Sequence, residues 1–269
     1  MPAEPGPPGI RCEGIAKRFE GPAGTLEAVA PLDLDFAGGR TTALVGPSGC
    51  GKSTLLRMIA GLEAPSAGTV RIGGETPAEV RTRAGLAVGF QDPSLLPWRT
   101  VQGNVALALK LARRRADPKA IERLLTLVGL EGFGTTRPGA LSGGMRQRAA
   151  IARCLVTEPE LLLLDEPFGA VDELTRRQLA HDLPRLWEAR GTTTLFVTHS
   201  VTEAVLISDR VLVLSPRPAR VVADIPVTLE RPRAEGVELT PAFAELAEAV
   251  SAALARGAAE AGPKGLAAQ

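Results

Sequence analysis

Aromatic residues, histidine and cysteine are scarce in this chain of 269 residues. It contains no tyrosine, two histidines and three cysteines, and aromatic side chains make up 3% of it. Cys12, Cys50 and Cys154 are odd in number, widely separated and without metal-ligand spacing. The sequence therefore predicts neither a disulfide framework nor a zinc site. Chemistry that needs an imidazole must depend on His181 or His199.

Long apolar runs and an excess of charge are also missing. No run approaches the roughly 20 apolar residues of a membrane-spanning helix. The N-terminus, Met-Pro-Ala-Glu-Pro-Gly-Pro-Pro-Gly, has neither the positive region nor the apolar region of a signal peptide. The 31 basic residues nearly balance the 30 acidic ones, whereas nucleic-acid binders usually carry a basic excess. We expect no nucleic-acid partner, and any role at a membrane requires a partner protein.

Strand-like runs alternate with helical patterns along most of the chain, which favours an α/β fold with a mostly parallel central sheet. Leu161–Leu164 is a continuous apolar run, typical of a strand buried on both faces. Between the strand-rich parts the pattern becomes helical. We predict a disordered lead-in at residues 1–9 and a single domain at residues 10–232. The core of this domain is 10–91 and 160–232, and a helical insertion of about 92–159 interrupts it. The tail, 233–269, is predicted to contain a short helix near Phe243–Leu254.

A glycine-rich segment follows the predicted strand Thr41–Val45 and precedes a predicted helix. The segment Gly46-Pro-Ser-Gly-Cys-Gly-Lys-Ser53 matches the phosphate-binding loop G-x-x-x-x-G-K-[ST]. Glycines let backbone N–H groups approach a phosphate, and the helix directs its positive N-terminal end at the same place. Lys52 adds a charge for the β- and γ-phosphates, and Ser53 offers a hydroxyl to Mg²⁺. The predicted nucleotide-binding residues here are Gly46, Pro47, Ser48, Gly49, Cys50, Gly51, Lys52, Ser53 and Thr54.

Two carboxylates follow the apolar run. In an open α/β sheet, ligands bind at the carboxyl ends of the strands, which is where Asp165 and Glu166 are expected. Asp165 suits Mg²⁺, and Glu166 suits polarisation of an attacking water. A solvated acidic strand end would explain the pair taken alone, but its combination with a phosphate-binding loop favours the catalytic interpretation.

A second glycine motif precedes these carboxylates by about twenty residues. Ser142 can cap the helical stretch that follows, and Gly143 and Gly144 leave its N–H groups open to an anion. With this motif the chain resembles the ATP-binding subunits of ABC transporters over roughly residues 10–232. The resemblance implies a P-loop NTPase core with a mostly parallel central sheet, an antiparallel β subdomain and an inserted helical subdomain.

The resemblance also implies roles for individual residues. Gln91 is similar to the glutamine that holds Mg²⁺ and the attacking water, and His199 to the switch histidine that contacts the γ-phosphate. Asp172 resembles the D-loop aspartate. Phe19 takes the place of the aromatic that stacks on adenine, where the family more often has tyrosine. The family signature corresponds to Leu141, Ser142, Gly143, Gly144 and Met145.

In this family the signature of one subunit completes the ATP site of the other. The resemblance therefore implies a homodimer that hydrolyses ATP with Mg²⁺ and moves a membrane partner between two states. The implied location is the cytoplasmic face of the inner membrane, with integral permease subunits as partners and an external binding protein as an indirect one.

Three further segments are similar to the nitrate, sulfonate, taurine and bicarbonate importers. They are 91–101, 165–176 and 213–233, although Ala219 stands where glycine is usual. Trp98 is either an anchor for the permease or a partly buried core residue.

The alternatives to an importer ATPase are a soluble cassette acting on ribosomes or DNA and a non-hydrolysing regulator. A single phosphate-binding loop disfavours the first, and the presence of Glu166 and His199 disfavours the second.

Overall fold

The computed structural model describes residues 6–22 and 24–260. Its strands are β1 Ile10–Gly21, β2 Gly24–Phe36, β3 Thr41–Val45, β4 Ala67–Ile72, β5 Leu86–Gly89, β6 Leu161–Asp165, β7 Thr193–Val197, β8 Arg210–Leu214 and β9 Val221–Pro226. Its α-helices are α1 Lys52–Ile59, α2 Pro77–Thr82, α3 Val101–Leu111, α4 Pro118–Leu127, α5 Gly143–Leu155, α6 Glu173–Asp182, α7 Pro184–Glu188, α8 Val201–Ile207 and α9 Pro241–Glu260. Two 3₁₀ turns, η1 Pro138–Ala140 and η2 Val237–Leu239, complete the described elements.

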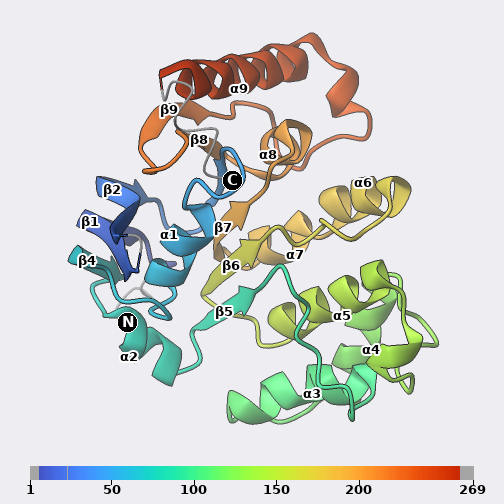
Figure 1. The fold of residues 1–269 in the computed structure, drawn as a ribbon. Coiled ribbons are helices and arrows are strands. Elements are labelled where there is room, and N and C mark those ends of the chain that lie inside the picture. Colours follow the sequence, from blue (N-terminus) through green and yellow to red (C-terminus); the bar gives the residue numbers. More distant parts are fainter. Residues whose placement is uncertain (1–5, 23, 261–269) are drawn as a thin grey trace, which may run out of the picture.

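The strands form two sheets (Figure 1). Six strands make the larger sheet in the order β5-β6-β7-β3-β8-β9, with β9 alone antiparallel to its neighbour. The smaller sheet is antiparallel in the order β2-β1-β4. Helices α3, α4 and α5 lie between β5 and β6 in the chain and gather on one side of the molecule (Figure 1). The predicted fold class, with its parallel core, antiparallel sheet and inserted helices, is confirmed.

Strand β6 shows why the central sheet must be buried on both faces. Successive side chains of a strand point to opposite sides. Leu161 and Leu163 join the hydrophobic cluster that includes α1 and the small sheet, whereas Leu162 and Leu164 join the cluster on the helical side. All four are at most 1% exposed. The continuous apolar run therefore has the two-sided burial that the sequence predicted.

Both ends of the described chain are held against this core, the first by hydrogen bonds and the last by packing. The Pro8 carbonyl accepts a hydrogen bond from the Thr193 hydroxyl at 2.7 Å, and the Gly9 carbonyl accepts one from the Gly73 amide at 2.8 Å. The prediction of a disordered lead-in is therefore wrong for Pro8 and Gly9, while residues 1–5 lie outside the described residues. The tail helix is longer than predicted: α9 has 20 residues and buries Phe243, Val250, Ala253 and Gly257.

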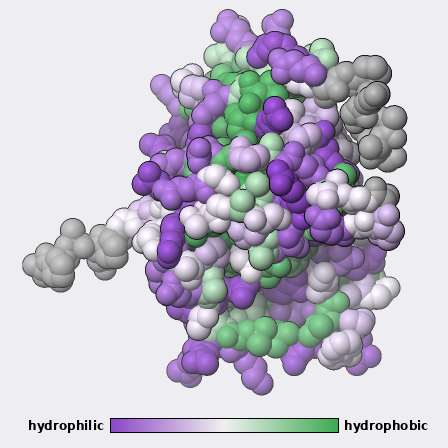
Figure 2. Space-filling model, turned by 60° about the vertical axis from the view of Figure 1, so that its left-hand side comes forward, coloured by the Kyte–Doolittle hydropathy of each residue, from purple (hydrophilic) through white to green (hydrophobic). Residues whose placement is uncertain are grey.

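The surface mixes hydrophilic and hydrophobic side chains, and the face in Figure 2 has separate apolar patches near its top and bottom. Within residues 6–22 and 24–260, no helix combines the length and the apolar character needed to cross a membrane.

Candidate nucleotide site

The glycine-rich loop between β3 and α1 wraps around the ammonium group of Lys52. The Lys52 Nζ donates to the carbonyls of Gly46 at 2.7 Å and Pro47 at 2.8 Å. Gly51 has a φ of +118°, and a Cβ there would lie 2.7 Å from the Ala28 carbonyl oxygen. A larger residue would therefore force the loop away from β2, and the glycine spacing of the motif has a direct steric reason.

The N-terminus of α1 can receive an anion. Its N-cap residue, Gly51, supplies no side-chain hydrogen bond to the first-turn N–H groups, and no acidic side chain occupies that turn. Open N–H groups and the positive end of a helix together favour a phosphate. The loop therefore fits the polyphosphate part of a nucleotide.

Ser53 and Asp165 meet at the end of β6, although they are far apart in the sequence. The Ser53 hydroxyl donates to Asp165 Oδ1 at 2.9 Å. Burial raises the pKa of Asp165, and this hydrogen bond opposes the rise. No group of three or more His, Cys, Asp or Glu side chains in the described part of the chain is placed to hold a metal. The Ser53 hydroxyl and the Asp165 carboxylate nevertheless fit Mg²⁺, which usually keeps several waters and binds through one or two protein oxygens plus phosphates.

Glu166 lies within reach of the two other residues predicted to act on the γ-phosphate. Gln91 Nε2 is 3.4 Å from Glu166 Oε2, and His199 Nδ1 is 3.5 Å from the same oxygen. The Glu166 amide donates to the Val197 carbonyl at 2.9 Å, which holds this residue beside the end of β7. Glu166 also has a φ of +47°, an uncommon conformation for a residue other than glycine. The fold thus brings one carboxylate, one amide and one imidazole together.

Glu166 and Gln91 line one pocket together with the phosphate loop, whereas Asp165 and His199 do not line it. Of the predicted nucleotide-binding and catalytic residues, its lining includes Phe19, Ser48, Gly49, Gly51, Lys52, Ser53, Thr54, Gln91 and Glu166. Phe19 is 38% exposed, so its ring is available to a flat ligand. The Lys17 ammonium lies 4.9 Å from the centre of that ring, and the same ammonium donates to the Ala64 carbonyl at 2.8 Å. The pocket therefore combines an aromatic edge, a phosphate loop and the carboxylate of Glu166.

Comparison with known proteins agrees with this geometry. A family model described as "ABC transporter" matches residues 29–169, more than half of the chain. This chain belongs to the ABC transporter family. It is 44% identical over 252 residues to the aliphatic sulfonates import ATP-binding protein SsuB of Cupriavidus necator, a match that covers 93% of this chain and 78% of that protein.

One further curated relative and one solved structure are also ABC transporter proteins. The taurine import ATP-binding protein TauB of Rhizobium johnstonii is 44% identical over 238 residues, covering 86% of this chain and 90% of the relative. Among solved structures, the dimeric structure of MJ0796, described as a bacterial ABC transporter cassette, superposes with a TM-score of 0.75 and 29% identity. That match covers 82% of this chain and all of the other.

The residues predicted to form the signature and the D-loop do not line the nucleotide pocket of their own chain. Ser142 caps α5 by accepting a hydrogen bond from the Met145 amide at 3.2 Å, and Asp172 caps α6 by accepting one from the Thr175 amide at 3.0 Å. The hydrogen bond from Thr175 lowers the pKa of Asp172. A Cβ on Gly144 would lie 3.0 Å from the Ala170 carbonyl oxygen, so this glycine lets α5 approach the D-loop closely.

Arg217 is a pocket residue that the sequence analysis did not assign to the site. Its Nε and Nη2 donate to the Gly49 carbonyl at 3.0 and 2.7 Å, and its side chain lines the pocket. Nearby, the Ala219 amide donates to the Ala28 carbonyl at 3.0 Å, which ties this loop to β2 beside the phosphate loop. The available signal was the Arg-Pro-Ala-Arg segment, which indicated a subfamily but gave no contact with the phosphate loop.

The structure also shows where Trp98 lies and which of the two histidines is near the site. Trp98 is 68% exposed, so the interpretation as a core tryptophan is wrong. His181 Nε2 lies 3.0 Å from Glu238 Oε1, where it links α6 to η2, away from the nucleotide pocket. Of the two histidines, His199 is therefore the one placed beside Glu166.

Proposed function

We propose that this cassette is the ATP-hydrolysing subunit of an importer for a small sulfonate-like or taurine-like solute. The observation that carries the hydrolytic part is the contact of Glu166 with both Gln91 and His199 next to the Ser53–Asp165 pair. The solute class is supported by the names of the SsuB and TauB relatives.

In this proposal each polar group has one task. Lys52 and the N–H groups of the phosphate loop bind the polyphosphate, and the exposed ring of Phe19 stacks on adenine. Ser53, Asp165 and Gln91 would hold Mg²⁺, which would neutralise charge on the phosphates. Glu166 orients and polarises the attacking water, and His199 contacts the terminal phosphate. Most of the rate enhancement then comes from positioning and charge stabilisation.

We further propose that the working form is a homodimer. The signature residues 141–145 and Asp172 would complete the site of the partner subunit. They lie outside the pocket of their own chain, and, unlike Asp165 and His199, they make no side-chain hydrogen bond or ion pair with its lining in the described part of the chain. Open N–H groups at the start of α5 suit the terminal phosphate of the partner's ATP. The description of the MJ0796 cassette as dimeric supports this arrangement.

Coupling to transport requires an integral permease, and Trp98 is our candidate for its contact. An exposed tryptophan is an unusual surface residue and a frequent anchor of protein interfaces. The cassette would then act at the cytoplasmic face of the inner membrane, and the external binding protein would reach it through the permease.

The test begins with a tagged Glu166→Gln variant and a matched Glu131→Gln control, in which an exposed carboxylate outside the pocket is changed. We expect Glu166→Gln to slow hydrolysis by ~100-fold or more, the usual contribution of a general base, while ATP binding survives. Near-normal hydrolysis by this variant would remove Glu166 from the role.

The same variant with ATP is then used to capture partners from native membranes. Recovery of a permease that takes up taurine or an alkyl sulfonate, once it is reconstituted with the unmodified cassette, would support the importer. Recovery of ribosomes or DNA, from a preparation that still binds ATP, would contradict it and favour the soluble-cassette alternative.

A further inference from the structure

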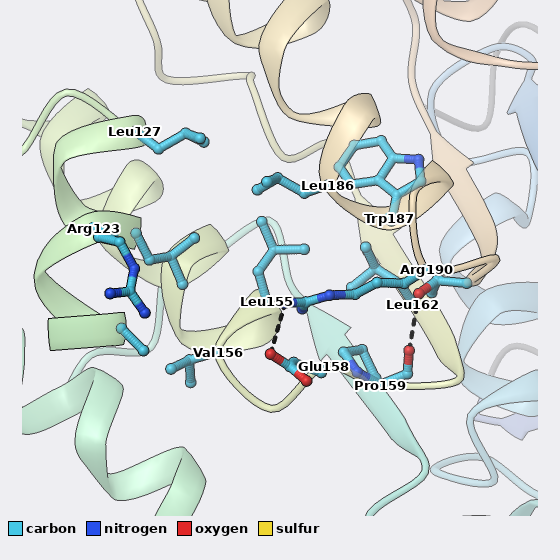
Figure 3. Close-up of a pocket in the computed structure, with 13 residues that line it drawn as sticks. Arg123, Leu127, Leu155, Val156, Glu158, Pro159, Leu162, Leu186, Trp187 and Arg190 are labelled. Atoms are coloured by element: carbon cyan, nitrogen blue, oxygen red, sulfur yellow. Dashed lines mark hydrogen bonds and ion pairs between the residues drawn. The ribbon is translucent and has the colours of Figure 1, made fainter. Parts of the chain in front are cut away.

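A second cavity lies between the inserted helices and the core (Figure 3). It measures about 320 Å³ and none of its lining residues borders the nucleotide pocket. One wall comes from α4 and the end of α5, and the other from α7 and β6. The lining residues are Ala120, Arg123, Leu124, Leu127, Leu155, Val156, Glu158, Pro159, Leu162, Leu186, Trp187, Arg190 and Thr192.

The interior of this cavity is apolar. Leu155, Leu162 and Trp187 are almost fully buried behind the lining, at 6%, 0% and 1% exposed, so the accessible hydrocarbon belongs to the half-buried Leu124, Leu127 and Leu186. The polar groups among them already have partners: the Trp187 indole N–H donates to the Thr41 hydroxyl at 3.2 Å, and the Thr192 hydroxyl donates to the Pro159 carbonyl at 3.1 Å. The interior therefore suits a hydrocarbon chain and offers little to a polar ligand.

The charged side chains at the edge favour a ligand with one negative charge. Arg190 donates to Glu158 at 2.6 Å, so these two charges balance. Arg123 approaches the cavity from α4 (Figure 3), and its ion-pair contact is Asp117 at 3.8 Å, beyond hydrogen-bond length, with 72% of the arginine side chain exposed. The planar guanidinium of Arg123 can donate two parallel hydrogen bonds to a carboxylate or sulfonate.

The walls of the cavity lead to the nucleotide machinery. Leu155 ends α5, whose first turn follows Ser142, and Leu162 lies on β6, which ends at Asp165. A ligand that contacts Leu124 and Leu127 on α4 and Leu186 on α7 would hold α4, which packs on α5, against α7. Motion between these two elements would then cost more free energy in the occupied state.

We propose that this cavity binds a linear amphipathic organic anion, with its hydrocarbon chain against Leu124, Leu127 and Leu186 and its carboxylate or sulfonate on Arg123. Occupancy restrains the inserted helices relative to α7 and slows ATP turnover. The site is distinct from the nucleotide pocket, and binding to it can be measured whether or not the proposed import function is correct.

The chain contains two tryptophans, which makes a direct assay possible. In a Trp98→Phe background, Trp187 is the sole indole and reports on the cavity. Decanoate, below its micellar concentration, is titrated while Trp187 fluorescence is followed, with decanol and decylammonium as neutral and cationic probes of the same chain length. We expect a saturable fluorescence change with decanoate and at least about tenfold weaker binding of decylammonium, since one good charged contact contributes about that factor.

Two variants separate the chain contact from the charge contact. Ala120→Phe, which adds a ring to the lining, should remove binding of both decanoate and decanol. Arg123→Gln should weaken decanoate about tenfold and leave decanol unchanged, whereas Lys119→Gln, one turn earlier on α4, should change neither. No saturable binding by cassettes that still bind ATP, or equal loss in Arg123→Gln and Lys119→Gln, would overturn the site. Binding without slower ATP turnover would overturn the regulatory half.

Discussion

The contact between Arg217 and the phosphate loop predicts a specific defect in nucleotide binding. Two nitrogens of this guanidinium donate to the carbonyl of Gly49, a residue with a φ of +69°. Hydrogen bonds that involve a charged group contribute roughly 1.5–3 kcal/mol. Because both bonds share one acceptor and the side chain is partly exposed, we take the low end, about 1.5 kcal/mol, which corresponds to a factor of roughly ten.

The hydrogen bonds of Arg217 stabilise the conformation of the phosphate loop that binds ATP, so their loss should lower the population of that conformation. If Arg217→Ala lowers the population of this conformation about tenfold, the apparent affinity falls by the same factor. Arg217→Lys keeps the charge but not the two-nitrogen geometry, so it should restore part of the affinity. The matched control is Arg220→Ala, which removes an exposed arginine from the same loop.

The assay is equilibrium binding of ATP and ADP by calorimetry, with a thermal melt of each variant. We expect Arg217→Ala to bind both nucleotides about tenfold more weakly while its melting temperature stays near that of Arg220→Ala. Equal affinities of the Arg217→Ala and Arg220→Ala variants would refute the reasoning. A large fall in melting temperature would instead assign Arg217 to general stability.

Three further variants test other parts of the structure. Ser142→Arg should abolish ATP-driven dimerisation in light scattering, since a bulky cation would enter the composite site; dimers that persist would contradict that site. Trp98→Ala should weaken co-purification of the permease and spare basal ATPase activity, and parallel loss of both would argue against an interface role. Glu203→Gln should raise the melting temperature at neutral pH. Burial raises the pKa of Glu203, so the contribution of its carboxyl to stability is present below its ordinary value of 4.5 and lost as pH rises through the folded pKa. The advantage of the amide should therefore shrink in acid, and an advantage that is independent of pH would contradict this account.

Local chemistry explains why much of the site could be predicted from the sequence. The phosphate loop depends on neighbouring residues, because glycines, one lysine and the start of a helix act within a few positions of one another. Ser142 and Asp172 each cap a helix by accepting a hydrogen bond from the amide three residues later, which is also a local property. The apolar run of β6 likewise indicated a strand buried on both faces.

Contacts between distant segments were decided by the tertiary structure. Gln91 and Glu166 are 75 positions apart, and Arg217 is 168 positions from Gly49. Their meeting depends on parallel strands whose carboxyl ends lie at one edge, with β5 beside β6 and β3 beside β8. No periodicity or local spacing in the chain encodes that strand order, so Arg217 could not be assigned from sequence.

The exposure of side chains and the presence of cavities were also decided by the tertiary structure. Trp98 and Trp187 are the two tryptophans of the chain, yet the side chain of Trp98 lies at the surface, with the residue 68% exposed, and Trp187 is 1% exposed. The difference arises because Trp187 packs between α7 and the central sheet and donates to Thr41, which is 146 positions away. The sequence by itself determined the local chemistry of the phosphate loop and the helix caps. Which side chains share a pocket was decided by the packing of elements, because burial is a property of neighbours that are distant along the chain.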